Sequence, residues 1–144
     1  MGLYPPVPEV GGIVQTASAL LAVNTTTTSI TYVDLLTVTL TTVGASRLEI
    51  YASLSTSNAV SRAGTNQDYF RLTVDSTVLI EGGSEQWTVT EASALFCVTD
   101  VLSAGSHTVH LQWCTDTGGT LRCSAGTIVA QPEHASLVVV ETTG

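Results

Sequence analysis

A run of alternating side chains between Ser29 and Val43 constrains the fold more than any other feature of the sequence. Apolar residues dominate one parity of the run: Ile30, Tyr32, Leu36, Val38 and Leu40. The other parity is rich in threonine and consists of Thr31, Val33, Leu35, Thr37, Thr39 and Thr41. Because successive side chains of a strand point to opposite faces of a sheet, the run predicts a strand with a buried face and a threonine-rich outer face. No ten-residue segment shows the 3.6-residue apolar spacing of an amphipathic helix.

Similar short apolar runs, bounded by turn residues, recur along the whole chain. We expect further strands at residues 13–23, 47–54, 69–74, 77–81, 86–90, 94–101, 107–114, 120–124 and 136–141, with a break at Gly82-Gly83. The polar stretch from Ser55 to Gln67 is expected to be the longest loop, and loops of this length often carry function. The predicted fold is therefore all-β, an antiparallel sandwich or jelly-roll of about 8–10 strands. A chain of 144 residues has the size of one domain, here residues 13–144.

Residues 1–12 are expected to form an extended arm that precedes this domain. Three prolines in four positions (Pro5, Pro6 and Pro8) forbid a helix and favour polyproline geometry. The arm carries residues that can be buried against a partner, and we predict that these bind it: Leu3, Tyr4, Pro5, Pro6, Val7 and Val10.

The charge balance excludes several classes of function. Only 11% of the residues are charged, lysine is absent, and the net charge is −8, so no basic patch can hold nucleic acid or an anionic membrane. The longest apolar runs are far shorter than the ~20 residues of a membrane-spanning helix, and the first residues lack the features of a signal peptide. Twenty-four threonines take the place of the missing charges. Such a surface suits a protein that is packed against neighbours, although an ordinary extracellular sandwich fits as well.

Two of the three cysteines are a candidate disulfide pair. If Gly118-Gly119 forms a two-residue hairpin turn, Cys114 faces Cys123 at a site where Cα atoms approach to ~4.5 Å, which a disulfide can bridge. Two reduced thiols are the alternative, expected in a reducing cytosol. Cys97 lies in an apolar strand and is expected in the core.

No catalytic or metal-binding constellation stands out, so neither an enzyme nor a cofactor is expected. His107 and His110 resemble a pair of metal ligands in their spacing. However, residues i and i+3 of a strand point to opposite faces, so the two rings cannot bind one ion. The sequence lacks the G-x-S-x-G elbow of many serine hydrolases and the glycine-rich phosphate-binding motifs. Trp87 and Trp113 are expected in the core, and a sugar-binding platform would need two or three exposed aromatic residues on one face.

The C-terminal half resembles jelly-roll domains of tailed-bacteriophage virion proteins. The likeness rests on the strand Ala94–Leu102, on the segment A-G-S-H-T-V-H-L-Q-W at residues 104–113, and on the closing strand A-S-L-V-V-V-E at residues 135–141. The wider architecture is similar to the trimeric tumour-necrosis-factor and C1q jelly-rolls. These motifs cover about a third of the chain and are structural.

The resemblance implies a homotrimeric structural protein on the capsid surface of a tailed phage, assembled in the host cytoplasm. A capsid decoration (cement) protein that stabilises the assembled head is the expected role, with the protein itself and the major capsid protein or another virion protein as partners. A tail or head fibre, or another receptor- or glycan-binding sandwich module, is the alternative.

Overall fold

A computed structural model gives the fold and describes residues 12–58, 66–86, 91–116, 119–123 and 134–143. Ten strands follow one another along the chain: β1 (Ile13–Leu20), β2 (Thr25–Thr27), β3 (Val33–Thr42), β4 (Ser46–Asn58), β5 (Asn66–Val74), β6 (Thr77–Gln86), β7 (Glu91–Val98), β8 (Gly105–Thr115), β9 (Leu121–Cys123) and β10 (Ala135–Thr143). No helix that could cross a membrane occurs among the described residues. The predicted all-β class is confirmed.

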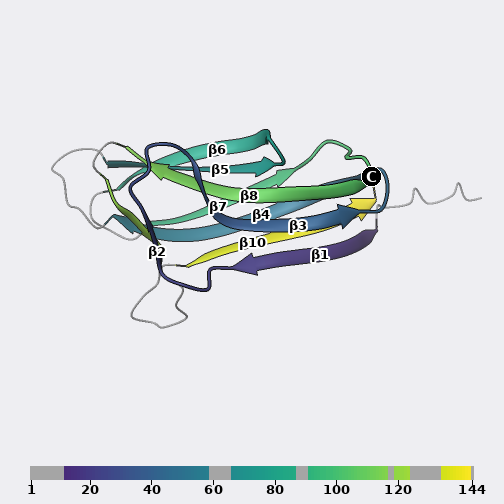
Figure 1. The fold of residues 1–144 in the computed structure, drawn as a ribbon, viewed down its shortest axis with the longest axis horizontal. Helices are drawn as coiled ribbons and strands as arrows, with labels where there is room; N and C mark the ends of the chain where they lie inside the picture. Colours follow the sequence, from purple (N-terminus) through teal and green to yellow (C-terminus); the bar gives the residue numbers. More distant parts are fainter. Residues whose placement is uncertain (1–11, 59–65, 87–90, 117–118, 124–133, 144) are drawn as a thin grey trace, which may run out of the picture.

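The strands form two antiparallel sheets whose order is that of a jelly-roll. One sheet has four strands in the order β3-β8-β5-β6. The other has six, in the order β1-β10-β4-β9-β2, with β7 paired to β4. Residues 49–54 of β4 pair with both β10 and β7, so these two strands flank β4 on opposite sides. Without the short β2 and β9, the sheets read β1-β10-β4-β7 and β3-β8-β5-β6, the arrangement of an eight-stranded jelly-roll. Figure 1 shows β5, β6 and β8 on one side of the molecule and β1 and β10 on the other.

Between the sheets lies an apolar core built by the alternation that the sequence predicts. In β3, Leu36, Val38 and Leu40 are buried while Thr37, Thr39 and Thr41 are exposed. An irregularity in the β3–β8 pairing between Asp34 and Leu36 accompanies burial of both Leu35 and Leu36. The most completely buried apolar residues are Leu48, Ile50, Leu54, Leu72, Val109, Leu111, Trp113, Leu121, Leu137 and Val139. They come from both sheets, so the core joins the two layers.

The predicted hairpin between Cys114 and Cys123 is wrong. β8 is an interior strand, paired with β3 along one edge and β5 along the other, and it has no edge left for β9. β9 pairs instead with β2 and the end of β4, where Cys123 lies opposite Thr25. Cys114 lies opposite Tyr69 in the other sheet, and the structure contains no disulfide between the two.

Most strand boundaries differ from the prediction by a few residues, and β2 was not predicted. The break at Gly82-Gly83 does not occur, because β6 continues through these glycines and pairs them with Phe70 and Tyr69. The long loop is shorter than expected, since β4 extends to Asn58 and β5 begins at Asn66. Of the segment predicted as a strand at residues 86–90, Gln86 closes β6 and the rest lies outside the described residues.

Candidate interaction surface

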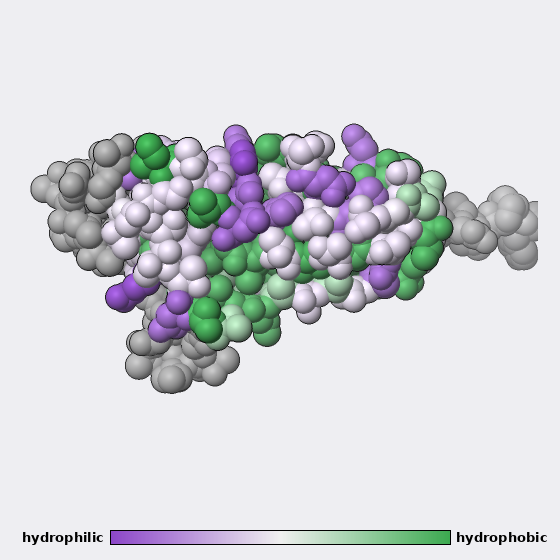
Figure 2. Space-filling model, in the orientation of Figure 1, coloured by the Kyte–Doolittle hydropathy of each residue, from purple (hydrophilic) through white to green (hydrophobic). Residues whose placement is uncertain are grey.

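The outer face of the four-stranded sheet is polar, and its charged side chains are engaged with one another. Arg71 Nε donates to Gln112 Oε1 at 2.7 Å, and Gln112 Nε2 donates to Asp34 Oδ1 at 2.7 Å. Nδ1 of His110 lies 3.1 Å from the same Asp34 oxygen. The Arg71 guanidinium also lies 4.1 Å from the centre of the Tyr32 ring. Figure 2 shows near-neutral and hydrophilic surface over β3 and β8, as the threonine pattern predicts.

The outer face of the six-stranded sheet is different, because apolar side chains gather on three adjacent strands. The register places Val138 of β10 beside Tyr51 of β4, and Tyr51 beside Phe96 of β7. Val140 and Val98 follow in a second row, on either side of Glu49. We call this set of five residues the apolar face: Tyr51, Phe96, Val98, Val138 and Val140. Phe96 is 54% exposed and Tyr51 is 45% exposed, so both rings are in contact with solvent.

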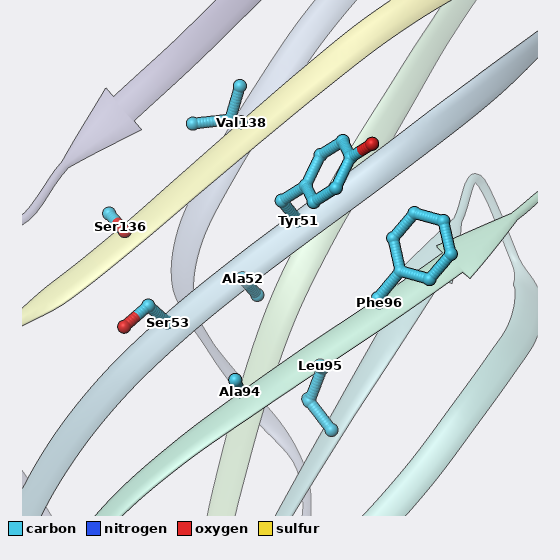
Figure 3. Close-up of a pocket in the computed structure, with 8 residues that line it drawn as sticks. All are labelled: Tyr51, Ala52, Ser53, Ala94, Leu95, Phe96, Ser136 and Val138. Carbon is cyan, nitrogen blue, oxygen red and sulfur yellow. The ribbon is translucent and has the colours of Figure 1, made fainter.

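A groove lies on the apolar face beside the two aromatic rings. The ring centroids are 4.9 Å apart and the ring planes are inclined by 37°, so the two rings pack in contact at a tilt. The groove has a volume of about 290 Å³. Figure 3 shows its lining residues, which come from three strands: Tyr51, Ala52, Ser53, Ala94, Leu95, Phe96, Ser136 and Val138.

Charge is confined to one end of the apolar face. Glu49 accepts a hydrogen bond of 3.0 Å from the Tyr51 hydroxyl, and this bond, followed by burial, raises the pKa of Tyr51. Arg47 begins the row and donates from Nη1 to the carbonyl oxygen of Thr99 at 3.2 Å. Beyond Tyr51, the described outward side chains of β4, β7 and β10 around the groove are uncharged: Ser53, Ala94 and Ser136. An occupant of the groove would therefore need to be mainly apolar.

At one end of the sandwich, a buried carboxylate links three strands. Glu141 of β10 is 0% exposed, and Ser46 Oγ donates to its Oε1 at 2.7 Å. Gln15 Nε2 of β1 donates to its Oε2 at 2.5 Å, and the Val43 amide donates to Oε1 at 3.3 Å. Burial raises the pKa of Glu141, but the three hydrogen bonds outweigh burial and leave the pKa below its usual range. This network is structural, since its groups are already satisfied by one another.

The structure places the site residues that the sequence predicted in different parts of the molecule, or does not describe them. The arm residues Leu3, Tyr4, Pro5, Pro6, Val7 and Val10 lie outside the described residues. Cys114 and Cys123 are buried thiols in different sheets. His107 and His110 do lie on opposite faces of β8, and no group of three or more metal-ligating side chains occurs in the described part of the chain. Trp113 is in the core as predicted, whereas Trp87 is not described.

Sequence reasoning missed Tyr51 and Phe96 as surface residues. The parity of β4 carried a usable signal, because Tyr51 falls opposite to Leu48, Ile50 and Leu54. No local pattern placed Phe96 beside it, since the β4–β7 pairing joins residues 45 positions apart.

Comparison with models of protein families finds no match, and comparison with curated proteins finds none either. Among solved structures, dimeric latent PorU from Porphyromonas gingivalis is similar with a TM-score of 0.53 and 10% identity, over 96% of this chain and 14% of that one. The infectious bursal disease virus VP2 subviral particle gives a TM-score of 0.46 and 13% identity, over 100% of this chain and 42% of that one. The structure of the infectious bursal disease virus Gx strain gives a TM-score of 0.46 and 11% identity, over 99% of this chain and 44% of that one. This chain therefore spans about a seventh of the PorU chain and less than half of each viral chain, and at these identities the PorU likeness shows the fold alone.

Proposed function

We propose that the chain is a structural virion protein of a tailed phage, a homotrimeric capsid decoration protein that stabilises the assembled head. The observation that carries the proposal is the apolar face, where exposed aromatic and aliphatic side chains of three adjacent strands of the six-stranded sheet lie together. Exposed apolar surface of this kind marks association sites. The occupant that we propose for it is a second copy of this chain.

The contrast between the two sheets supports an assembly role. The four-stranded sheet presents threonines and a self-satisfied polar network, which suit contact with water. The six-stranded sheet presents Tyr51 and Phe96 with few charges around them. The phage-like motifs at residues 94–141 support the virion setting, and they include β7 and β10, which build the apolar face.

The proposed mechanism is mass action. A protein that binds only the assembled shell stabilises that shell in proportion to occupancy. A cyclic trimer offers three equivalent attachments, so weak single contacts combine into tight binding.

A test is to purify particles of the phage that encodes the chain. These particles are compared with particles of a mutant phage from which the gene for the chain is deleted. The proposal predicts that the chain co-purifies with the heads, and that heads without it release DNA at a lower temperature. Heads that lack the chain in the wild-type strain, or that are equally stable without it, would contradict the proposal.

A second candidate, a glycan-binding module, is favoured by one observation. Tyr51 and Phe96 supply two exposed aromatic rings on one face, with the hydroxyls of Ser53 and Ser136 in the same groove. Sugars stack on such rings and bond to such hydroxyls. A glycan array with the wild-type chain and the Phe96→Ser variant tests this role: binding that depends on Phe96 would favour it over assembly.

A further inference from the structure

We infer that the groove beside Tyr51 and Phe96 receives the proline-rich N-terminal segment, residues 3–9, of a neighbouring copy of the chain. The inference deepens the proposed function and rests on it, because it names the contact through which copies associate. It concerns the groove on the six-stranded sheet and a segment whose sequence is Leu-Tyr-Pro-Pro-Val-Pro-Glu.

The chemistry of the segment fits the groove. Pro5 and Pro8 are spaced as in P-x-x-P, and Pro-rich segments of this type dock into grooves lined by aromatic residues. A polyproline helix loses little conformational entropy on binding, because proline fixes its backbone beforehand. The groove offers the Tyr51 and Phe96 rings together with small side chains beside them (Figure 3), so the flat proline rings can approach the sheet.

Charge and spacing give a register for this docking. Glu9 is the single charged residue among residues 1–12, and Arg47 is the cation at the end of the apolar face. Arg47 and Tyr51 are four residues apart on β4, which corresponds to about 13 Å along a strand. Pro5 and Glu9 are also four residues apart, about 12 Å in a polyproline helix. A segment with Pro5 over Tyr51 therefore brings Glu9 to Arg47.

The geometry of Gly12 favours a neighbouring copy as the donor of the segment. The Gly12 amide donates to Thr143 Oγ1 at 2.9 Å, and the Thr143 amide donates to the Gly12 carbonyl at 3.0 Å. Gly12 is thereby held in line with β1, at the outer end of the sheet. A segment that continues in this direction leaves its own sheet, whereas return to its own groove needs a full reversal within a few residues. If each copy places its segment in the groove of the next copy, the contacts are head-to-tail. A cyclic oligomer closes such a series of contacts into a ring.

Two full-length variants test the inference. Phe96→Ser damages the groove and leaves the segment, while the double variant Leu3→Ser, Val7→Ser damages the segment and leaves the groove. Val101→Ser is the matched control, because Val101 is 51% exposed and does not line the groove. Light scattering should show an oligomer for the wild type and the control, and a monomer of 15.0 kDa for each of the two variants.

Mixing the two monomeric variants gives the decisive result. The Phe96→Ser chain still carries an intact segment and the double variant still carries an intact groove, so the mixture should contain a heterodimer of twice 15.0 kDa at high concentration. This gain cannot arise from misfolding. Two variants that stay monomeric when mixed would overturn docking between copies. An oligomer that survives both sets of substitutions would overturn the inference and leave the proposed trimer standing, whereas a monomeric wild type would overturn the proposed function itself.

Discussion

Asp75 in the β5–β6 turn and His107 of the interior strand β8 are joined by a hydrogen bond of 2.9 Å between Asp75 Oδ2 and His107 Nδ1. The other Asp75 carboxylate oxygen accepts the Thr108 amide at 2.9 Å, and His107 Nε2 lies 3.0 Å from the Ser103 carbonyl oxygen. Asp75 adopts a positive φ of 54°, which Asp and Asn tolerate better than most residues. The pair therefore ties a tight turn to the centre of its sheet.

The first prediction is that this pair makes stability depend on pH. The bonds to Ser103 and Asp75 raise the pKa of His107 above its usual value of about 6.5. The stability that protonated His107 contributes to the fold is thus fully present below about pH 6.5. It is lost as the pH rises through the raised pKa. The bonds from Thr108 and His107 lower the pKa of Asp75 from about 3.9. The stability that ionised Asp75 contributes is therefore present above that pH and is lost only in stronger acid. Urea unfolding over a pH series should show highest stability between about pH 4 and 6.5.

Substitution identifies the source of the alkaline decline. Asp75→Asn keeps a residue that tolerates the positive φ but removes the charge, and it should flatten the decline between pH 6 and 8. His134→Gln is the control, because His134 is exposed and lies outside the Asp75 pair. A decline that is unchanged in Asp75→Asn would mean that another group causes it.

The second prediction concerns Glu141. Glu141→Ala should destabilise the fold by about 3 kcal/mol, because Ser46, Gln15 and the Val43 amide would lose their acceptor in a buried site. Glu141→Gln should cost less, since it keeps one acceptor oxygen. Glu81→Gln is the control, an exposed carboxylate with a single surface ion pair of 3.6 Å to Arg71. Equal unfolding midpoints for Glu141→Ala and Glu81→Gln would refute the structural role of the Glu141 network.

The third prediction concerns the core. Leu111 of β8 is 0% exposed and lies opposite Leu72 of β5 and Leu36 of β3. Leu111→Ala should cost about 3 kcal/mol, from lost transfer energy and the cavity that remains. Val78→Ala, at a position 44% exposed, should change stability by less than about 0.5 kcal/mol. Denaturant unfolding of both variants measures the difference, and similar values would place Leu111 outside the core.

The fourth prediction concerns the thiols. Cys114 and Cys123 lie in different sheets, so the chain should unfold with three reactive thiols when no reductant is present. In the folded state, Cys97 should react first with a maleimide, because it is half-buried while the other two are buried. Burial also raises the pKa of Cys97 and Cys114, which slows both. Mass spectrometry after labelling in urea should find three labels, whereas a single label would indicate that two of the three cysteines are joined in a disulfide.

Local alternation allowed much of the fold to be predicted from the sequence. The parity of Leu36, Val38 and Leu40 is a property of a single strand and was predicted correctly, whereas Ile30 of the same parity is exposed and Leu35 of the other parity is buried. The Cys114–Cys123 hairpin failed because pairing is a property of the whole sheet, in which β3 and β5 already occupy both edges of β8. Gly82 and Gly83 look like a break in isolation, but pairing with Phe70 and Tyr69 keeps them in β6.

The candidate site was less accessible to sequence reasoning than the core. Tyr51 is recognisable as outward-facing from its own strand, but its partner Phe96 comes from β7 and Val138 from β10. Only the jelly-roll order brings these three strands together. A surface assembled from distant segments leaves no periodic signal in any one of them.

The apolar face on the six-stranded sheet is the surface through which copies of the chain are proposed to associate. Light scattering of the full-length wild type, beside Phe96→Ser and the control Val101→Ser, tests this claim most directly. We predict a mass near three times 15.0 kDa for the wild type and the control, and a mass of 15.0 kDa for Phe96→Ser. The same mass for all three proteins, whether monomer or oligomer, would contradict the claim.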